Sequence, residues 1–380
     1  MKNHTIQYKE GKWTGLDFPE ENKAKVQVVL VFADRFIVED GLVQQHLKTH
    51  FKNAEIITCS SAGEINHRAA EEGTALCTAI QFEKTTIAVS KGNIYDCRNS
   101  YALGVQVASA LPKNNLKFVL LISDGNLVNG DALLEGVQSL TNEEVLISGG
   151  LAGDSNRFQK TLVGLNDDIR EGNIVMLGLY GNHIKVATGI EGGWDVFGPE
   201  KLITKSSGNM LSEIDNTNAL DLYKTYLGKY ADQLPSSALL FPLSVKPNHS
   251  DNFLVRTILS IDENSKQMKF AGDVPEGSVV RFMKSNFDRL INAASEAESK
   301  LILQMNEVKP ELVLVISCVG RKIVLSDRIE EEVEAATDRF STDTTIAGFF
   351  SYGEIAPPEQ QKRSRLHNQT ITITAFAELP

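Results

Sequence analysis

The chain has 380 residues, with 38 lysines and arginines against 49 aspartates and glutamates, a net charge of −11, and no basic stripe of the kind that binds nucleic acid. Its length suggests two or three domains, and 42% hydrophobic residues are ample for a buried core. No apolar run approaches the ~18 residues of a membrane span, no secretory signal opens the sequence, and four cysteines are too few for a disulfide framework. We therefore expect a reduced, cytoplasmic protein without membrane insertion.

One pattern occurs three times along the chain. In each copy a β-branched, apolar run ends in a small, glycine-containing turn and then an acid, and the copies align without a gap. Such self-similarity indicates a repeated structural unit. The copies are IITCSSAGE at residues 56–64, LISGGLAGD at 146–154 and IAGFFSYGE at 346–354.

Each copy is preceded by another buried-strand pattern, which ends at Asp34, Asp124 or Cys318. The stretches between the two strands have helical period, as in residues 131–140 and 327–340, where an aspartate can cap the helix start. Each unit therefore reads strand, helix, strand, and a crossover of this length favours parallel pairing.

More strand patterns follow each acid, and a Gly181-Asn182 pair between two of them predicts a hairpin turn. The polar residues 215–221 then open a helical pattern and suggest a domain boundary. Residues 254–284 read as strands joined by turns, and residues 285–304 have the composition of a helix. We expect an α/β chain with mixed α+β character, in which mixed sheets are built from three strand-helix-strand units.

Ligand sites in sheets with parallel strands form beyond the carboxyl ends of the strands, which is where the glycine-acid turns lie in this arrangement. Glycine permits close approach of backbone N–H groups to a ligand, and a carboxylate next to it can hold an ammonium or guanidinium group. The alternative for any single copy is a glycine that only makes the turn and an acid in solvent or near a helix start. The predicted ligand-binding residues are Ser60, Ser61, Gly63, Glu64, Gly149, Gly150, Gly153, Asp154, Ser351, Tyr352, Gly353, Glu354, His367 and Asn368.

Cysteine and histidine leave other chemistry open. Cys59 and Cys318 end predicted strands, where N–H groups can stabilise a thiolate, but neither has a recognisable catalytic partner and a packing role is favoured. His367 enters a strand of the third unit, where a ligand role and a core hydrogen-bonding role have equal weight. Any single histidine can bind haem iron, so haem stays open as a cofactor. No zinc, nucleotide-binding or catalytic motif is present, so we expect no enzyme activity.

Several segments together resemble the FIST family, and they span nearly the whole chain. The resemblance implies a FIST N domain at residues 25–218, with the first two units, and a FIST C domain at residues 219–380, with the third. The segments are CSSAGEI at 59–65, GGLAGD at 149–154, TKSSGN at 204–209, ALDLYKTYLG at 219–228, FAGDVPEGSVVRFMK at 270–284, SCVGRKIVLSDRIEEEVE at 317–334, GFFSYGEIAP at 348–357 and LHNQTITIT at 366–374.

The resemblance implies an intracellular sensory module for a small ligand, which acts in signal transduction. Our leading hypothesis is a non-enzymatic sensor that signals through a separate partner. A small polar metabolite, such as an amino acid, binds between loops of both domains, with Glu64, Asp154 or Glu354 facing its cationic group.

Two alternatives remain. The first, which the resemblance also suggests, is a haem-binding nitric oxide sensor that regulates a separate histidine kinase, with His367 as axial ligand and His183 or His249 as the next candidates. The second is a cysteine-dependent enzyme that uses Cys59 or Cys318.

Overall fold

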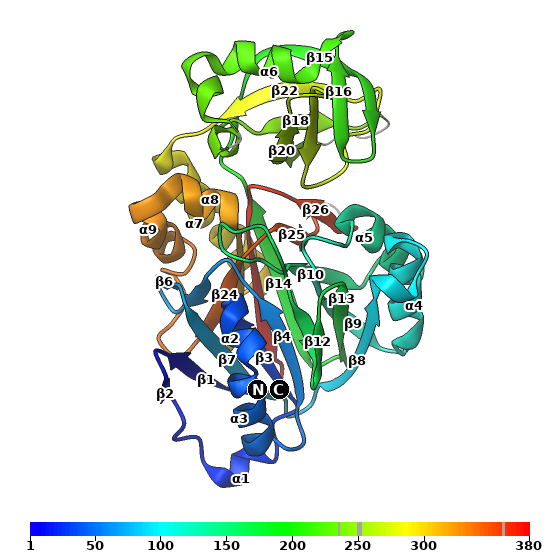
Figure 1. The fold of residues 1–380 in the computed structure, drawn as a ribbon. Coiled ribbons are helices and arrows are strands. Elements are labelled where there is room, and N and C mark those ends of the chain that lie inside the picture. The colour runs from blue at the N-terminus through cyan, green and yellow to red at the C-terminus, as the bar shows by residue number, and fades with distance from the viewer. Residues whose placement is uncertain (235, 249–252, 359–361) are drawn as a thin grey trace.

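The repeated unit predicted from the sequence is present in all three copies. The structure, a computed structural model, describes residues 1–234, 236–248, 253–358 and 362–380 and has a mixed α/β fold (Figure 1). In each unit two parallel strands are joined by a crossover that contains helix, and a third strand runs antiparallel beside the first. The units are β3 Val28–Ala33, β4 Glu55–Ser60 and β7 Thr74–Gln81 with α2 Arg35–Asp40 and α3 Leu42–His50; β9 Leu116–Ser123, β10 Leu146–Leu151 and β13 Asn173–Tyr180 with α5 Gly130–Gln138; and β23 Leu312–Cys318, β24 Thr345–Ser351 and β27 Ile371–Glu378 with α8 Val319–Leu325 and α9 Ile329–Ala335.

Continuous hydrophobic runs explain the central strands. Every residue of β3 and of β23 is buried, because strands that are covered on both faces are apolar throughout rather than alternating. The helix after β3 begins at Asp34, whose side chain accepts a hydrogen bond from the Phe36 N–H. The local sequence therefore accounts for both the strand and the start of its crossover.

Short strands tie the three units into a closed ring. A short strand that contains or follows each acid leaves its own unit and pairs antiparallel with another: β5 with β24, β11 with β4, and β25 with β10. Each unit thus gives one strand and receives one, and aromatic side chains of different units meet in the shared core, as Phe32 stacks on Phe349 at 4.6 Å. The exchanged strands are β5 Glu64–Asn66, β11 Val163–Leu165 and β25 Gly353–Ala356.

Other elements widen and cover the sheets. Helix α7 packs on β14 and β27, and α4 lies against α5 so closely that a Cβ at Gly104 would be 2.2 Å from the Leu133 carbonyl oxygen. Within the described residues, no helix has both the length and the hydrophobicity needed to cross a membrane. The elements are β1 Lys2–Lys9, β2 Lys12–Thr14, α1 Glu20–Lys23, β6 Ala69–Glu71, β8 Thr86–Asn93, α4 Ser100–Ala110, β12 Asp168–Arg170, β14 Ile184–Glu191, α7 Phe287–Met305 and β26 Arg365–His367.

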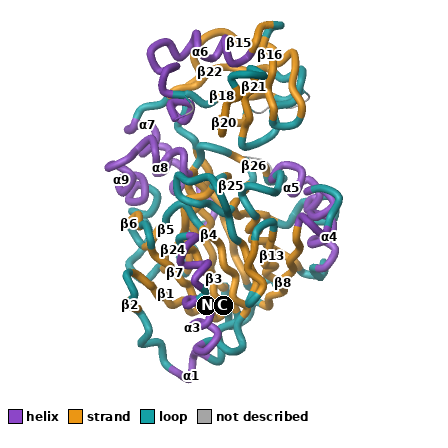
Figure 2. Tube along the Cα trace, viewed as in Figure 1, coloured by secondary structure: helices purple, strands orange, loops and turns teal. Residues whose placement is uncertain are grey.

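The chain between the second and third units forms a separate lobe, which we define as residues 195–284. The lobe has an antiparallel sheet with a core of its own and lies beyond the end of the body where β25 and β26 are found (Figures 1 and 2). The predicted boundary between residues 218 and 219 falls inside this lobe, between β17 and α6. The lobe elements are β15 Asp195–Ser207, β16 Met210–Ile214, β17 Thr217–Asn218, α6 Ala219–Leu227, β18 Leu243–Lys246, β19 Leu254–Arg256, β20 Ile258–Asp262, β21 Gln267–Phe270 and β22 Val279–Lys284.

The hairpin predicted at Gly181-Asn182 is wrong. The chain does turn there, with a φ of 106° at Gly181, but β13 pairs with β8 and β9 whereas β14 pairs with β27. Because both edges of β13 are already hydrogen-bonded, β14 has no edge of β13 to join. It adds to the sheet of the third unit instead.

Candidate functional site

The glycine-acid turns of the three units meet inside the body. Each turn donates a backbone N–H to a carbonyl oxygen of another unit, so segments far apart in the chain lie side by side. This contact follows from the exchange of the strands that leave the turns. The hydrogen bonds run from Ala62 to Phe350 (2.8 Å), from Gly153 to Ser60 (2.9 Å) and from Tyr352 to Leu151 (3.1 Å).

The glutamates of the first and third turns, Glu64 and Glu354, are buried and held in matching ways. Each accepts hydrogen bonds from the serine three residues before it and from a threonine near the start of the next long strand. Burial raises the pKa of Glu64 to about 7 and that of Glu354 to about 8, against the opposing effect of these hydrogen bonds. Both carboxyl groups therefore face protein donors rather than solvent. The donors are Ser61 and Thr74 (2.6 Å) for Glu64, and Ser351 (2.5 Å) and Thr370 (2.8 Å) for Glu354.

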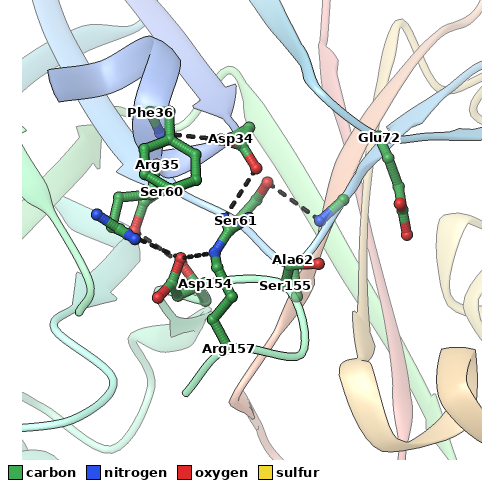
Figure 3. Close-up of polar contacts among 12 residues, drawn as sticks. Asp34, Arg35, Phe36, Ser60, Ser61, Ala62, Glu72, Asp154, Ser155 and Arg157 are labelled. Carbon is green, nitrogen blue, oxygen red and sulfur yellow. Dashed lines mark hydrogen bonds and ion pairs between the residues drawn. The ribbon is translucent and has the colours of Figure 1, made fainter. Parts of the chain in front are cut away.

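Asp154, the acid of the second turn, binds two arginines instead (Figure 3). Its Oδ1 accepts hydrogen bonds from Nε of Arg35 at 2.9 Å and Nε of Arg157 at 2.6 Å. Burial of Asp154 acts to raise its pKa, but these hydrogen bonds outweigh burial and lower the pKa below its ordinary value. Both guanidinium groups also lie over the ring of Phe36, at 4.2 and 4.7 Å from its centroid. The guanidinium partner predicted for a ligand is thus supplied by the chain itself.

The small residues of the turns make structural contacts. Ser60 Oγ donates to the Gly153 carbonyl oxygen and accepts from the Leu162 N–H, both at 2.8 Å. A Cβ at Gly149 would lie 1.9 Å from the Leu121 carbonyl oxygen, so the strands can approach only where glycine is present. A Cβ would also meet a neighbouring atom within 3.0 Å at Gly63, Gly150, Gly153 and Gly353.

His367 and Asn368 are buried near the third turn. His367 is the cross-strand partner of Glu354, and its Nε2 lies 3.1 Å from the Ala356 carbonyl oxygen. Burial lowers the pKa of His367 to about 4, so the ring is neutral at pH 7. Neither polar atom of the fully buried Asn368 side chain has a hydrogen-bond partner among the described residues.

A cavity of about 370 Å³ lies between the body and the lobe, and we call it the lobe cavity. Its body wall is formed by the carboxyl end of β23, the start of α8 and the Tyr352 ring, which stacks on Phe158 at 4.7 Å. Its other wall comes from lobe residues before and in β20 and just after β21. This contribution has no signal in the sequence because it depends on how the lobe sits. Of the predicted site residues, Tyr352 lines the cavity. Other lining residues are Phe158, Thr257, Cys318, Gly320 and Ile323.

A second cavity, of about 430 Å³, adjoins the lobe cavity, and we call it the charged cavity. Asn156, Val319 and Ile323 line both. Lys322, Glu72 and Asp327 give the second cavity its charge, and Lys322 contacts Glu72. The Lys322 Nζ also donates to the Ala62 carbonyl oxygen at 2.7 Å, which places this cavity at the edge of the first turn.

Comparison with known families decides what kind of protein this is. Residues 27–217 match the FIST N domain, and residues 219–357 match the FIST C domain. The chain belongs to the FIST family. FIST domains are sensory domains of signal transduction, as the resemblance of the sequence motifs implied.

Other comparisons add little to the FIST assignment. No match was found among curated proteins. Among solved structures, the chain is similar to a cyanuric acid hydrolase from A. caulinodans, with 6% identity and a TM-score of 0.41 over 100% of this chain and 99% of that one. A likeness at this level carries no inference about the site.

The two cysteines considered as nucleophiles are both buried in the FIST fold. Cys59 has no exposed surface, and Cys318 is 3% exposed in the wall of the lobe cavity. Burial raises the pKa of both thiols well above the ordinary value. Neither is therefore a thiolate at neutral pH, which does not favour cysteine chemistry.

The two described histidines considered as haem ligands, His367 and His183, do not fit that role in this FIST protein. The Nε2 of His367 is engaged by a backbone carbonyl, and His183 is exposed in the turn after β13. Neither lines the lobe cavity or the charged cavity. His249 lies outside the described residues. Across the part of the chain that the structure describes, no three histidine, cysteine or acidic side chains gather in a way that would hold a metal ion.

Proposed function

We propose that this FIST protein is a non-enzymatic sensor that binds a small ligand in the lobe cavity. One observation supports the location: the cavity lies beyond the carboxyl ends of the parallel strands β23 and β24, the usual position of ligand sites in such sheets. Its volume of about 370 Å³ is typical of small-molecule sites, which also favour the contact between two parts of a protein.

A more specific form of the proposal places an amino acid or similar polar metabolite at the glycine-acid turns. There, a ligand amine would have to replace the hydroxyl donors of Glu64 and Glu354 or the two arginines on Asp154. The geometry favours the adjoining lobe cavity, which Tyr352 reaches from the third turn. In this arrangement the three acids hold the turns in place beneath the ligand.

Helix α8 links the cavity to the connections between body and lobe. Gly320 and Ile323 of α8 line the cavity, while Arg321 between them is fully buried against Glu332. Arg321 donates to the carbonyl oxygen of Gly192, which precedes the lobe, and to that of Leu290, which follows it, the latter at 2.9 Å. A ligand that binds one arrangement of body and lobe more tightly shifts the population toward it. We infer that a separate partner, such as a histidine kinase, reads this shift.

Thermal unfolding in the presence of a metabolite panel tests the proposal. A ligand at one hundred times its dissociation constant adds about 2.7 kcal/mol to the folded state, which is a measurable rise in Tm. Ile323→Trp puts a larger side chain in the wall of the lobe cavity and should abolish the rise. Leu127→Trp is the matched control, since Leu127 is 41% exposed against 40% for Ile323 and does not line the lobe cavity. The proposal fails if no compound raises Tm, or if the Ile323 variant responds like the wild type.

A further inference from the structure

The described residues that line the lobe cavity are all uncharged. They are mostly aliphatic or aromatic, and the polar ones carry amide, hydroxyl or thiol groups. An ionised ligand group in such a place loses its hydration without gaining a charged partner, which is strongly unfavourable. The lining thus disfavours zwitterions and carboxylates, in contrast to the cationic group expected from the sequence.

Two buried polar atoms, one in this wall and one behind it, have no hydrogen-bond partner among the described residues. Thr257 is 5% exposed, lines the lobe cavity, and has an unpartnered Oγ1. Gln369 is fully buried behind Gly320, where a Cβ would meet its amide atoms at 2.5 to 2.8 Å. Its Nε2 donates to the carbonyl oxygen of Leu239, another lining residue, at 3.3 Å, and its Oε1 is unpartnered. Because buried polar groups are nearly always satisfied, the Thr257 Oγ1, which also lines the cavity, points to a missing partner there.

We propose that the lobe cavity takes an uncharged, largely apolar small molecule that carries one N–H or O–H donor. The donor bonds to the Thr257 hydroxyl, while the apolar remainder lies against Ile323 and the Tyr352 ring. This inference rests on the proposed function, because it assigns a ligand class to that same cavity.

The charged cavity next door provides the contrasting alternative. A carboxylated ligand could extend past Ile323 toward Lys322, the cation in its wall. Lys322 already contacts Glu72 and the Ala62 carbonyl oxygen, so an anion there would compete with existing partners. The neutral ligand needs no such exchange, which is why the observations favour it.

Three ring-matched probes separate these possibilities by calorimetry: indole, which is neutral and has one N–H donor; 1-methylindole, which lacks the donor; and indole-3-carboxylate, which is charged. We expect indole to bind, 1-methylindole to bind about tenfold more weakly for the loss of one hydrogen bond, and the carboxylate to bind least. Equal binding of indole and 1-methylindole would overturn the role of the donor. Tighter binding of the carboxylate, lost in Lys322→Met, would overturn the neutral class.

Variants locate the polar contact. Thr257→Val keeps the side-chain shape and should weaken indole binding several-fold. Thr372→Val is the control, because Thr372 is also buried with an unpartnered Oγ1 but does not line the lobe cavity. If Thr257→Val binds indole as the wild type does, the assigned contact is wrong.

Failure of this inference is distinguishable from failure of the proposed function. If a charged metabolite binds and Ile323→Trp abolishes its binding, the cavity is the sensory site and only the ligand class is wrong. If indole binding and every Tm rise are unaffected by Ile323→Trp, the cavity itself is not the site, and both proposals fall.

Discussion

Replacement of Glu354 by glutamine tests whether this buried carboxyl group is protonated in the folded protein. Burial raises the pKa of Glu354 from 4.5 to about 8, so the folded state binds the proton more tightly than the unfolded chain. Its stabilising contribution is therefore complete below pH 4.5 and is lost as the pH rises through about 8. At 1.36 kcal/mol per pKa unit, the loss over this range is roughly 4 to 5 kcal/mol.

Glutamine is a close neutral analogue of the protonated acid at this position. Its carbonyl oxygen can accept from the Thr370 N–H and hydroxyl, and its amide can donate to the Ser351 hydroxyl, which is free to rotate. We expect Glu354→Gln to match the wild type within about 1 kcal/mol near pH 5. It should exceed the wild type increasingly as the pH approaches 8.

Urea unfolding at intervals from pH 5 to pH 8 measures this difference. Glu64→Gln should behave in the same direction with a smaller effect of roughly 3 kcal/mol, because burial raises the pKa of Glu64 to about 7. Glu144→Gln is the control, since Glu144 is exposed and its hydrogen bond to Lys362 lowers its pKa, so it stays ionised throughout. Identical pH dependence in the wild type and Glu354→Gln would refute the reasoning.

Three more outcomes follow from buried groups. Arg321→Met should lower the free energy of unfolding, measured in urea, by about 3–5 kcal/mol because Glu332 loses its buried partner. Adding Glu332→Gln to this variant should recover part of the loss. No recovery would contradict a stabilising ion pair between Arg321 and Glu332. Glu378→Gln should lower stability by about 1–2 kcal/mol at pH 7 and leave it unchanged near pH 2, as followed by Tm. Burial acts to raise the pKa of Glu378, but backbone N–H donors lower it to about 2, so the stabilising contribution of its carboxylate is present above pH 4.5 and is lost as the pH falls toward 2. A loss of stability that persists at pH 2 would contradict this. A thiol reagent followed by mass spectrometry at neutral pH should modify the half-exposed Cys97 well before the buried Cys318, and fast labelling of Cys318 would restore the case for a cysteine enzyme.

The local elements of this protein could be predicted from the sequence alone. Apolar runs such as residues 28–33 and 312–318 have to be buried on both faces. The predicted capping aspartates were wrong, because Asn129 caps α5 and no side-chain hydrogen bond caps α9. The gapless threefold repeat carried enough information to predict three equivalent units and to place their glycine-acid turns at strand ends. These features depend on neighbours within one segment, so they can be recognised without knowledge of the fold.

Tertiary structure alone decided which edges pair and what each polar group faces. The same residue pattern turns Glu64 inward onto hydroxyl donors of its own unit and Asp154 onto two arginines, of which Arg35 comes from the first unit. Equally, β14 joined a remote sheet since both edges of β13 were occupied. The lobe cavity depends on residues such as Thr257 and Cys318, which approach only when the lobe sits against the body. Burial and pairing across such separations are properties of the whole packed chain, whereas hydrophobic periodicity is a property of each segment.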